Sequence, residues 1–294
     1  MQYIESFLKY LKYEKRYSDH TLVAYENDLR QFETYLVDRG IMDERNIKTR
    51  VIRDWVVTLH YNNIKPRSIH RKIAALRSYF KHLLRAKIIE TSPVDGVVLP
   101  KLPKNLPDFV KENEMDLLLD QVPFSKDYSG IRDYTIIDLF YGTGMRLSEL
   151  VALKDHNFDL KSGIVKVLGK RNKERLVPLN RSTVQNVTHY IKVRNNTFAG
   201  ESFQTFFLTD KGQPIYHKLV YRIVQKHLKL VTTMAQKSPH ILRHTYATVL
   251  LNRGADINAI KELLGHANLN ATQIYTHNTF EKLSAIYKQA HPRA

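Results

Sequence analysis

The sequence predicts a mainly α-helical protein of two domains, an N-terminal helical bundle followed by an α-rich domain with a small antiparallel β-sheet. Apolar residues recur at helical spacing through most of the chain. Two short β-rich runs flank a single polar turn in the second half. A cluster of prolines divides the 294 residues into two parts, and each part is long enough to form a domain.

The first 90 residues are expected to form the helical bundle. Apolar side chains repeat at helical spacing over residues 4–11 and again over 22–36. Ser18 precedes the second run, where its hydroxyl can accept a hydrogen bond from a backbone amide of the first turn. Gly40 follows the run and is expected to close that helix.

One stretch of this bundle is strongly basic. The residues from Trp55 to Ile89 include eight lysines and arginines and no acidic residue. An apolar stripe from Ile69 to Leu83 is expected to face the core, with basic side chains on another face of the same helix. Solvated helix faces usually mix charges, because pairs of opposite sign stabilise the helix. A face of one sign therefore indicates contact with phosphates, and the candidates are Lys65, Arg67, Arg71, Lys72, Arg77, Lys81 and Arg85.

Four prolines mark the boundary between the two domains. Proline lacks a backbone donor and disfavours helix in the residue before it. Residues 91–107 are therefore expected to form a stiff linker, and its prolines are Pro93, Pro100, Pro103 and Pro107.

The second domain, residues 108–294, is predicted to be helical around a small sheet. Helices are expected near 112–121, 128–141 and 147–153, and again from Lys218 onward. The β-rich runs 164–168 and 175–179 flank a polar turn typical of a hairpin, and another short strand is expected at 206–208. The apolar run from Phe280 to Tyr287 is expected to dock either on a neighbouring protomer or on its own domain.

Composition and charge narrow the class of protein. The chain has 46 Lys and Arg against 29 Asp and Glu, a formal net charge of +17, which favours a polyanionic partner. Without cysteine, disulfides, thiolate metal sites and a cysteine nucleophile are excluded. No apolar run approaches the roughly 18 residues of a membrane helix, and the first residues lack the order of a signal peptide. A cytoplasmic location is expected.

Four segments of the second domain hold unusual polar residues in apolar surroundings. They read YGTGMRLSEL at 141–150, LGK at 168–170, HILRH at 240–244 and LGH at 264–266, with Tyr275 nine residues further on. In chain order they supply Arg146, Lys170, His240, Arg243, His266 and Tyr275. This pattern resembles the signature of the tyrosine recombinase (phage integrase) family, specifically its Xer branch, at all six positions. The resemblance covers almost the whole chain, including the basic helical bundle.

The resemblance implies an enzyme that cuts and rejoins DNA at specific sites, with no metal and no cofactor. Tyr275 would be the nucleophile that forms a 3′-phosphotyrosyl link, and His240 would assist it as a base. Lys170 would protonate the departing 5′ hydroxyl, and His266 would donate a hydrogen bond to a phosphate oxygen. The remaining roles in the family pattern are those of the two phosphate-binding arginines, Arg146 and Arg243. Glu149, three residues after Arg146, is expected to orient neighbouring groups.

The residue types also suit this reaction on general grounds. Attack on a phosphodiester builds negative charge, and planar guanidinium groups match phosphate oxygens in pairs. A phenol with an ordinary pKa of about 10 is protonated at neutral pH. Nearby arginine charge favours the phenolate, and an imidazole can accept the proton.

The resemblance also implies partners. The N-terminal bundle would be a SAM-like core-binding domain that grips duplex DNA together with the catalytic domain. Four protomers would act on two DNA sites through a Holliday junction, as a homo- or hetero-tetramer. The Xer branch typically resolves chromosome dimers at a terminus, dif-like site, with a paralogous recombinase and an FtsK-type DNA translocase as partners.

Other functions are compatible with parts of this pattern. A mobile-element integrase or invertase would carry the same six residues, and a type IB topoisomerase shares the tyrosine and much of the cationic pocket. A non-catalytic DNA-binding accessory protein has no use for the tyrosine.

Two alternative motifs fail on single residues. His240 and His244 lie four residues apart, as metal ligands do, but Ile stands at position 241 and Arg243 would repel a cation. The glycines at 142 and 144 lack the third glycine of a dinucleotide loop, since Leu147 takes its place.

Overall fold

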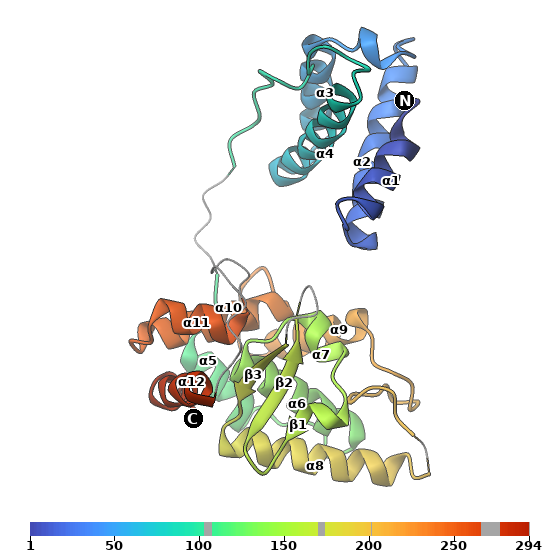
Figure 1. Cartoon of the computed structure of the whole chain (residues 1–294). Helices are drawn as coiled ribbons and strands as arrows, with labels where there is room; N and C mark the ends of the chain where they lie inside the picture. The colour runs from blue at the N-terminus through green and yellow to red at the C-terminus, as the bar shows by residue number, and fades with distance from the viewer. Residues whose placement is uncertain (103–107, 170–173, 201, 266–276, 294) are drawn as a thin grey trace. The chain divides into compact units, whose positions relative to one another are not determined.

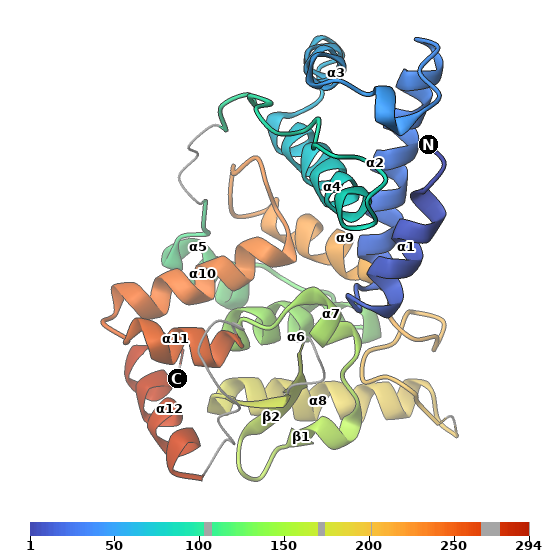
Figure 2. The same cartoon turned by 45° about the horizontal axis from the view of Figure 1, so that its top comes forward.

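The computed structural model describes residues 1–102, 108–169, 174–200, 202–265 and 277–293 (Figures 1 and 2). The chain divides into two compact units, Met1–Asn105 and Leu106–Ala294. The described part of the first unit is helical, and the second combines helices with a three-stranded antiparallel sheet. The predicted mainly α fold class is confirmed. Among the described helices, none combines the length and apolar character needed to cross a membrane.

The described part of the first unit, residues 1–102, contains four α-helices that bury one apolar face each. Its core includes Phe32, Trp55 and Phe80, all at most 2% exposed. Ser18 is the residue that precedes α2, as predicted, but the predicted hydrogen bond to a backbone amide is wrong. Its hydroxyl instead contacts the hydroxyl of Thr21 at 2.9 Å. The helices are α1 (Ile4–Tyr13), α2 (Asp19–Val37), α3 (Thr49–Tyr61) and α4 (Pro66–Arg85), with a 3₁₀ turn at Glu44–Asn46.

The second unit begins with a helix whose last turn widens. Here α5 (Glu112–Asp116) continues into a π-helical turn, Leu117–Gln121, so that the two together span the predicted helix at 112–121. The remaining helices of the unit are α6 (Tyr128–Thr143), α7 (Leu147–Val151), α8 (Arg181–Thr197), α9 (His217–Leu228), α10 (Pro239–Asn252), α11 (Ile257–Leu264) and α12 (His277–Ala290), with a 3₁₀ turn at Asp155–Asn157.

The sheet has the order β1-β2-β3, with β1 (Phe158–Asp159), β2 (Ile164–Leu168) and β3 (Glu174–Pro178). The predicted hairpin is confirmed, since β2 and β3 pair antiparallel with Val165 opposite Val177. The strand predicted at 206–208 is wrong. That segment forms only an isolated β-bridge, and its backbone hydrogen bonds involve two separate segments. Phe206 N donates to Leu153 O, and Ile215 N donates to Phe207 O. It therefore has no single strand partner.

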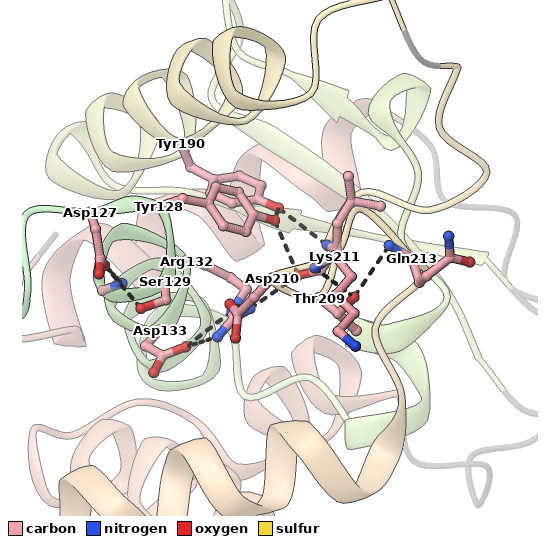
Figure 3. A network of polar contacts seen from close by, with 12 residues as sticks. Asp127, Tyr128, Ser129, Arg132, Asp133, Tyr190, Thr209, Asp210, Lys211 and Gln213 are labelled. Atoms are coloured by element: carbon pink, nitrogen blue, oxygen red, sulfur yellow. Dashed lines mark hydrogen bonds and ion pairs between the residues drawn. The ribbon is translucent and has the colours of Figure 1, made fainter.

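A polar network ties the turn at 209–213 to α6 (Figure 3). Arg132 donates to Asp210 at 2.6 Å and to Asp133 at 2.8 Å. Tyr128 donates to the carbonyl of Leu208 at 3.1 Å, and its hydroxyl lies 3.1 Å from that of Tyr190 on α8. These contacts fix the chain just before α9 begins.

The last helix packs on its own unit in the structure of the single chain. Leu283 and Tyr287 of α12 are at most 3% exposed and belong to one apolar cluster with Tyr246 of α10 and Leu263 of α11. Figures 1 and 2 both show α12 beside α11. Of the two arrangements expected from the sequence, the chain by itself adopts the one within its own domain.

Candidate active site

The position of Arg146 follows from a sharp turn after α6. Gly144 ends that helix with φ +58°, in the left-handed region that side chains disfavour. A Cβ at Gly144 would collide with Tyr246 and lie 2.8 Å from Leu264 Cδ2. The close packing of this turn against α10 and α11 brings Arg146 to the start of α7, next to the end of α11.

A buried carboxylate holds Arg146. Glu149 is 4% exposed and accepts from both the backbone amide and the Nη1 of Arg146, each at 2.7 Å. Its place in the first turn of α7 also suits a negative charge. The side chain of Arg146 stays 31% exposed, and its Nη2 donates to Gly265 O at 3.1 Å. Glu149 thus orients the guanidinium and leaves part of it open to a ligand.

Arg243 on α10 is the second candidate arginine, and it lies close by. It is 9% exposed and donates to the carbonyls of Gly144 at 2.6 Å and Leu264 at 2.7 Å. Burial is the largest cause that lowers the pKa of Arg243 to about 10, and the positive charges of Arg146 and Arg175 contribute to the same value. The two arginine contributions agree with the hydrogen bonds in placing these guanidinium groups close together.

The sequence prediction missed a third arginine of the same cluster, Arg175 on β3. It is 4% exposed and donates to both oxygens of Glu149, at 3.0 and 2.8 Å, and to Leu263 O at 2.8 Å. A signal was present in the sequence, because strand alternation places Arg175 on the same buried face as Val177. A charge at a core position of a strand needs a buried partner.

The structure describes only some of the six predicted catalytic residues. It brings Arg146 and Arg243 together with Glu149. His240 is exposed and lies three residues before Arg243 on α10, hence on the same side of that helix. The other three, Lys170, His266 and Tyr275, lie outside the described residues.

The cluster carries a net positive charge. Three guanidiniums and one carboxylate leave +2 within a space shared by α7, α10, α11 and β3. Such fixed cations can bind an oxyanion and stabilise charge that builds on phosphate. Within the described residues, no group of three or more His, Asp or Glu side chains could hold a metal ion.

The basic face of α4 is partly neutralised from α2. Asp28 is 1% exposed and forms ion pairs with Arg71 and with Lys72, whose Nζ lies 2.9 Å away. The side chain of Lys72 is only 11% exposed, while that of Arg71 is 50% exposed. Arg85 donates to the hydroxyl of Tyr10 at 2.7 Å. Among the described residues, the exposed candidates on or next to α4 that form no ion pair with an acidic side chain are Lys65, Arg67, Arg77, Lys81 and Arg85.

A second basic surface, on α9, was also missed by the sequence prediction. Residues 211–255 contain eight lysines and arginines and no acidic residue, the same signal that marked residues 55–89. On α9, Lys218, Arg222 and Lys226 are exposed and lie four residues apart, while Val220 and Val224 are buried. One stripe of this helix is therefore a further candidate for phosphate contact.

Comparison with known proteins places this site in a family. The model of the phage integrase family matches residues 108–282, and that of the phage integrase N-terminal SAM-like domain matches residues 4–87. The chain is 38% identical to tyrosine recombinase XerC of Chlorobaculum tepidum, over 100% of this chain and 95% of that one. It is 35% identical to tyrosine recombinase XerD of Staphylococcus saprophyticus, over 99% of each chain. The crystal structure of XerH recombinase bound to a palindromic difH substrate has a similar fold, with TM-score 0.73 and 21% identity over 96% of this chain and 82% of that one.

Proposed function

The chain belongs to the phage integrase family, in its Xer branch of tyrosine recombinases, and on that basis we propose that it resolves chromosome dimers by recombination at a terminus, dif-like site. Enzymes of this family cut and rejoin DNA. Support for the finer function comes from identity to both XerC and XerD relatives over nearly the full chain. The observation that carries the chemistry is the cluster of Arg146, Arg243 and Glu149 at the end of α11, where His266 follows directly in the sequence.

In the proposed reaction, the phenol oxygen of Tyr275 attacks the phosphorus of the scissile phosphodiester. A Tyr275–phosphorus bond forms and the bond from phosphorus to the 5′ oxygen breaks, leaving a 3′-phosphotyrosyl link. His240 accepts the phenol proton, and Lys170 donates a proton to the 5′ oxygen as it departs.

The charge that builds on phosphate meets fixed cations. Arg146 and Arg243 pair with its non-bridging oxygens, and His266 adds one hydrogen bond. The 5′ hydroxyl of a partner duplex then attacks the phosphotyrosyl link, and a Holliday junction results. No nucleotide cofactor is needed, because the covalent link conserves the phosphodiester bond energy. No metal is needed either, because the arginines supply the positive charge that stabilises the phosphate.

We propose that both units contact DNA phosphates through their basic helices. The first unit would use the exposed cations of α4, and the second the stripe on α9 that contains Lys218, Arg222 and Lys226. Such contacts release counterions, so site binding should weaken steeply as salt rises. A flat salt response would argue against these surfaces.

The proposed partners follow from the family. The protein would act in the cytoplasm as a tetramer on two synapsed sites, either alone or with a paralogous recombinase. An FtsK-type DNA translocase would regulate it. The XerC and XerD relatives favour the paralogous pair, since the chain is similarly identical to both.

A suicide substrate tests the chemistry directly. A nick beside the scissile phosphate lets the cut strand diffuse away, so the covalent protein–DNA adduct accumulates. Tyr275→Phe should bind the site and form no adduct, while Tyr216→Phe, at an exposed tyrosine of the same unit, should form adduct normally. Arg146→Lys should bind and cleave poorly, because an ammonium cannot replace a paired guanidinium contact. Adduct formation by Tyr275→Phe would refute the assignment of the nucleophile.

Mapping the adduct on genomic DNA separates the biological alternatives. Adducts at a terminus site support dimer resolution, whereas adducts at the ends of a mobile element indicate an integrase or invertase. Relaxation of a plasmid that lacks any recombination site would indicate a type IB topoisomerase. A protein that binds DNA and never forms an adduct would be an accessory protein.

A further inference from the structure

We infer that Arg175 is a positioning residue of the active site. Through Glu149 it sets the orientation of Arg146 and the net charge of the arginine cluster, and it also fixes the end of α11. The inference rests on the proposed function, because it assigns Arg175 a part in DNA cleavage. Arg175 lies five residues after Lys170 in the sequence.

The contacts of Arg175 use its guanidinium on two sides. Nη1 and Nη2 donate to the two oxygens of Glu149, at 3.0 and 2.8 Å, and Nε donates to Leu263 O at 2.8 Å. All three bonds are buried. Arg175 therefore links β3 to α7 and to α11 within one side chain. Lysine has a single ammonium group and cannot reproduce this fork.

Three consecutive carbonyls at the end of α11 accept from three different arginines. Leu263 O accepts from Arg175 at 2.8 Å, Leu264 O from Arg243 at 2.7 Å, and Gly265 O from Arg146 at 3.1 Å. The last carbonyls of a helix have no partner within the helix, so these bonds satisfy them. The backbone that leads into His266 is thus held by the same side chains that we expect to bind phosphate.

Gly265 makes room for this arrangement. Its φ is +66°, and a Cβ there would lie 3.2 Å from both Cδ and Nη1 of Arg175. This spacing is tighter than ordinary van der Waals contact, so a side chain at position 265 would require Arg175 to shift. The carbonyl of the same residue is bonded to Arg146.

Arg175 also sets the charge available to substrate. Glu149 accepts from Arg146 and Arg175 together, so its single negative charge is shared between two cations. Burial by itself would raise the pKa of the Glu149 carboxyl, but Arg175 and then Arg146 lower it to about 2, so that it stays ionised. Without Arg175, the carboxylate would pair with Arg146 alone, and the net charge of the cluster would fall from +2 to +1.

The experiment measures single-turnover adduct formation on the nicked substrate, with DNA affinity and thermal unfolding followed in parallel. Arg175→Lys should slow adduct formation by roughly 10- to 100-fold through misplacement of Arg146, with site affinity within about twofold of the wild type. Arg175→Gln should be slower still. The double variant Arg175→Gln with Glu149→Gln should regain part of the lost rate, because Arg146 is no longer neutralised by the carboxylate and the net charge of the cluster returns to +2.

A matched control is Arg194→Lys, at an arginine of α8 that is 1% exposed and paired with Asp155 at 2.8 and 2.7 Å. It should lower thermal stability and leave the adduct rate of the folded protein unchanged. A wild-type rate in Arg175→Lys, or a double variant no faster than Arg175→Gln, would overturn the inference. Failure of the wild-type protein itself to form any adduct would instead overturn the proposed function.

Discussion

Acidification should loosen the C-terminal helix through one buried histidine. His291 follows α12 and is 3% exposed, with its ring stacked on Tyr287 at a centroid distance of 4.9 Å. Its Nε2 lies 3.2 Å from the carbonyl of Tyr141 on α6. Burial lowers the pKa of His291 to about 4, opposed in part by this contact and reinforced by Arg253 and Arg293. The neutral ring fits the site and the charged ring does not.

The size of the effect follows from the two pKa values. An unfolded histidine titrates near 6.5, so the unfolded or undocked chain takes up the proton first. The stabilisation from His291 is complete above about pH 6.5 and is lost progressively as the pH falls toward the folded pKa of about 4. Between about pH 8 and about pH 5, one such group raises the equilibrium constant of unfolding by a factor of about 30. This corresponds to a loss of about 2 kcal/mol in the free energy of unfolding.

Two measurements test this prediction. The histidine ring protons, followed by NMR from about pH 8 to about pH 3.5, should include one that titrates near 4 and disappears in His291→Phe. Urea unfolding of the catalytic unit within the full chain should show that the wild type loses about 2 kcal/mol more than His291→Phe over about pH 8 to 5. A His291 ring that titrates near 6.5, or equal losses in the two proteins, would refute the reasoning.

Two further substitutions test the fold around the site and the basic face. Gly144→Ala should destabilise the catalytic unit by about 2–5 kcal/mol in urea unfolding. The new Cβ would collide with Tyr246 and Leu264, and alanine is strained in the left-handed backbone conformation of this residue. Unchanged stability would mean that the turn relaxes freely. Asp28→Asn should lower the stability of the first unit by about 1–2 kcal/mol, because Arg71 and Lys72 on α4 lose their ion-pair partner. The two cations would then be free to contact phosphate, so DNA binding should become more dependent on salt. A salt dependence equal to that of the wild type would show that these cations do not contact phosphate.

The helices and the hairpin could be predicted because their patterns are local. Helical periodicity gave α2 and α6 to within a few residues, and two β-rich runs around a polar turn gave β2 and β3. The third strand could not be predicted in this way. The strand β1 is only two residues long, and Phe206 to Leu208 has the composition of a strand but bonds to several separate segments.

The order of the candidate catalytic residues could be recognised from the sequence, but contacts between distant segments could not. Asp28 and Arg71 are 43 residues apart, so no local pattern indicates their ion pair. Strand alternation indicates that Arg175 faces the core, but its partners Glu149 and Leu263 lie in segments far from it in the sequence. The convergence of Lys170, His266 and Tyr275 on the same cluster stays a prediction.

The three arginines at the end of α11 carry a consequence for the resting enzyme. The three guanidinium groups repel one another, and the charges of Arg146 and Arg175 add to burial, the main cause, in lowering the pKa of Arg243. The unliganded domain therefore holds a local electrostatic strain that an incoming phosphate relieves. Because the cations are already in place, binding of a phosphate should require little reorganisation of the site, and the substrate should stabilise the native state as well as react.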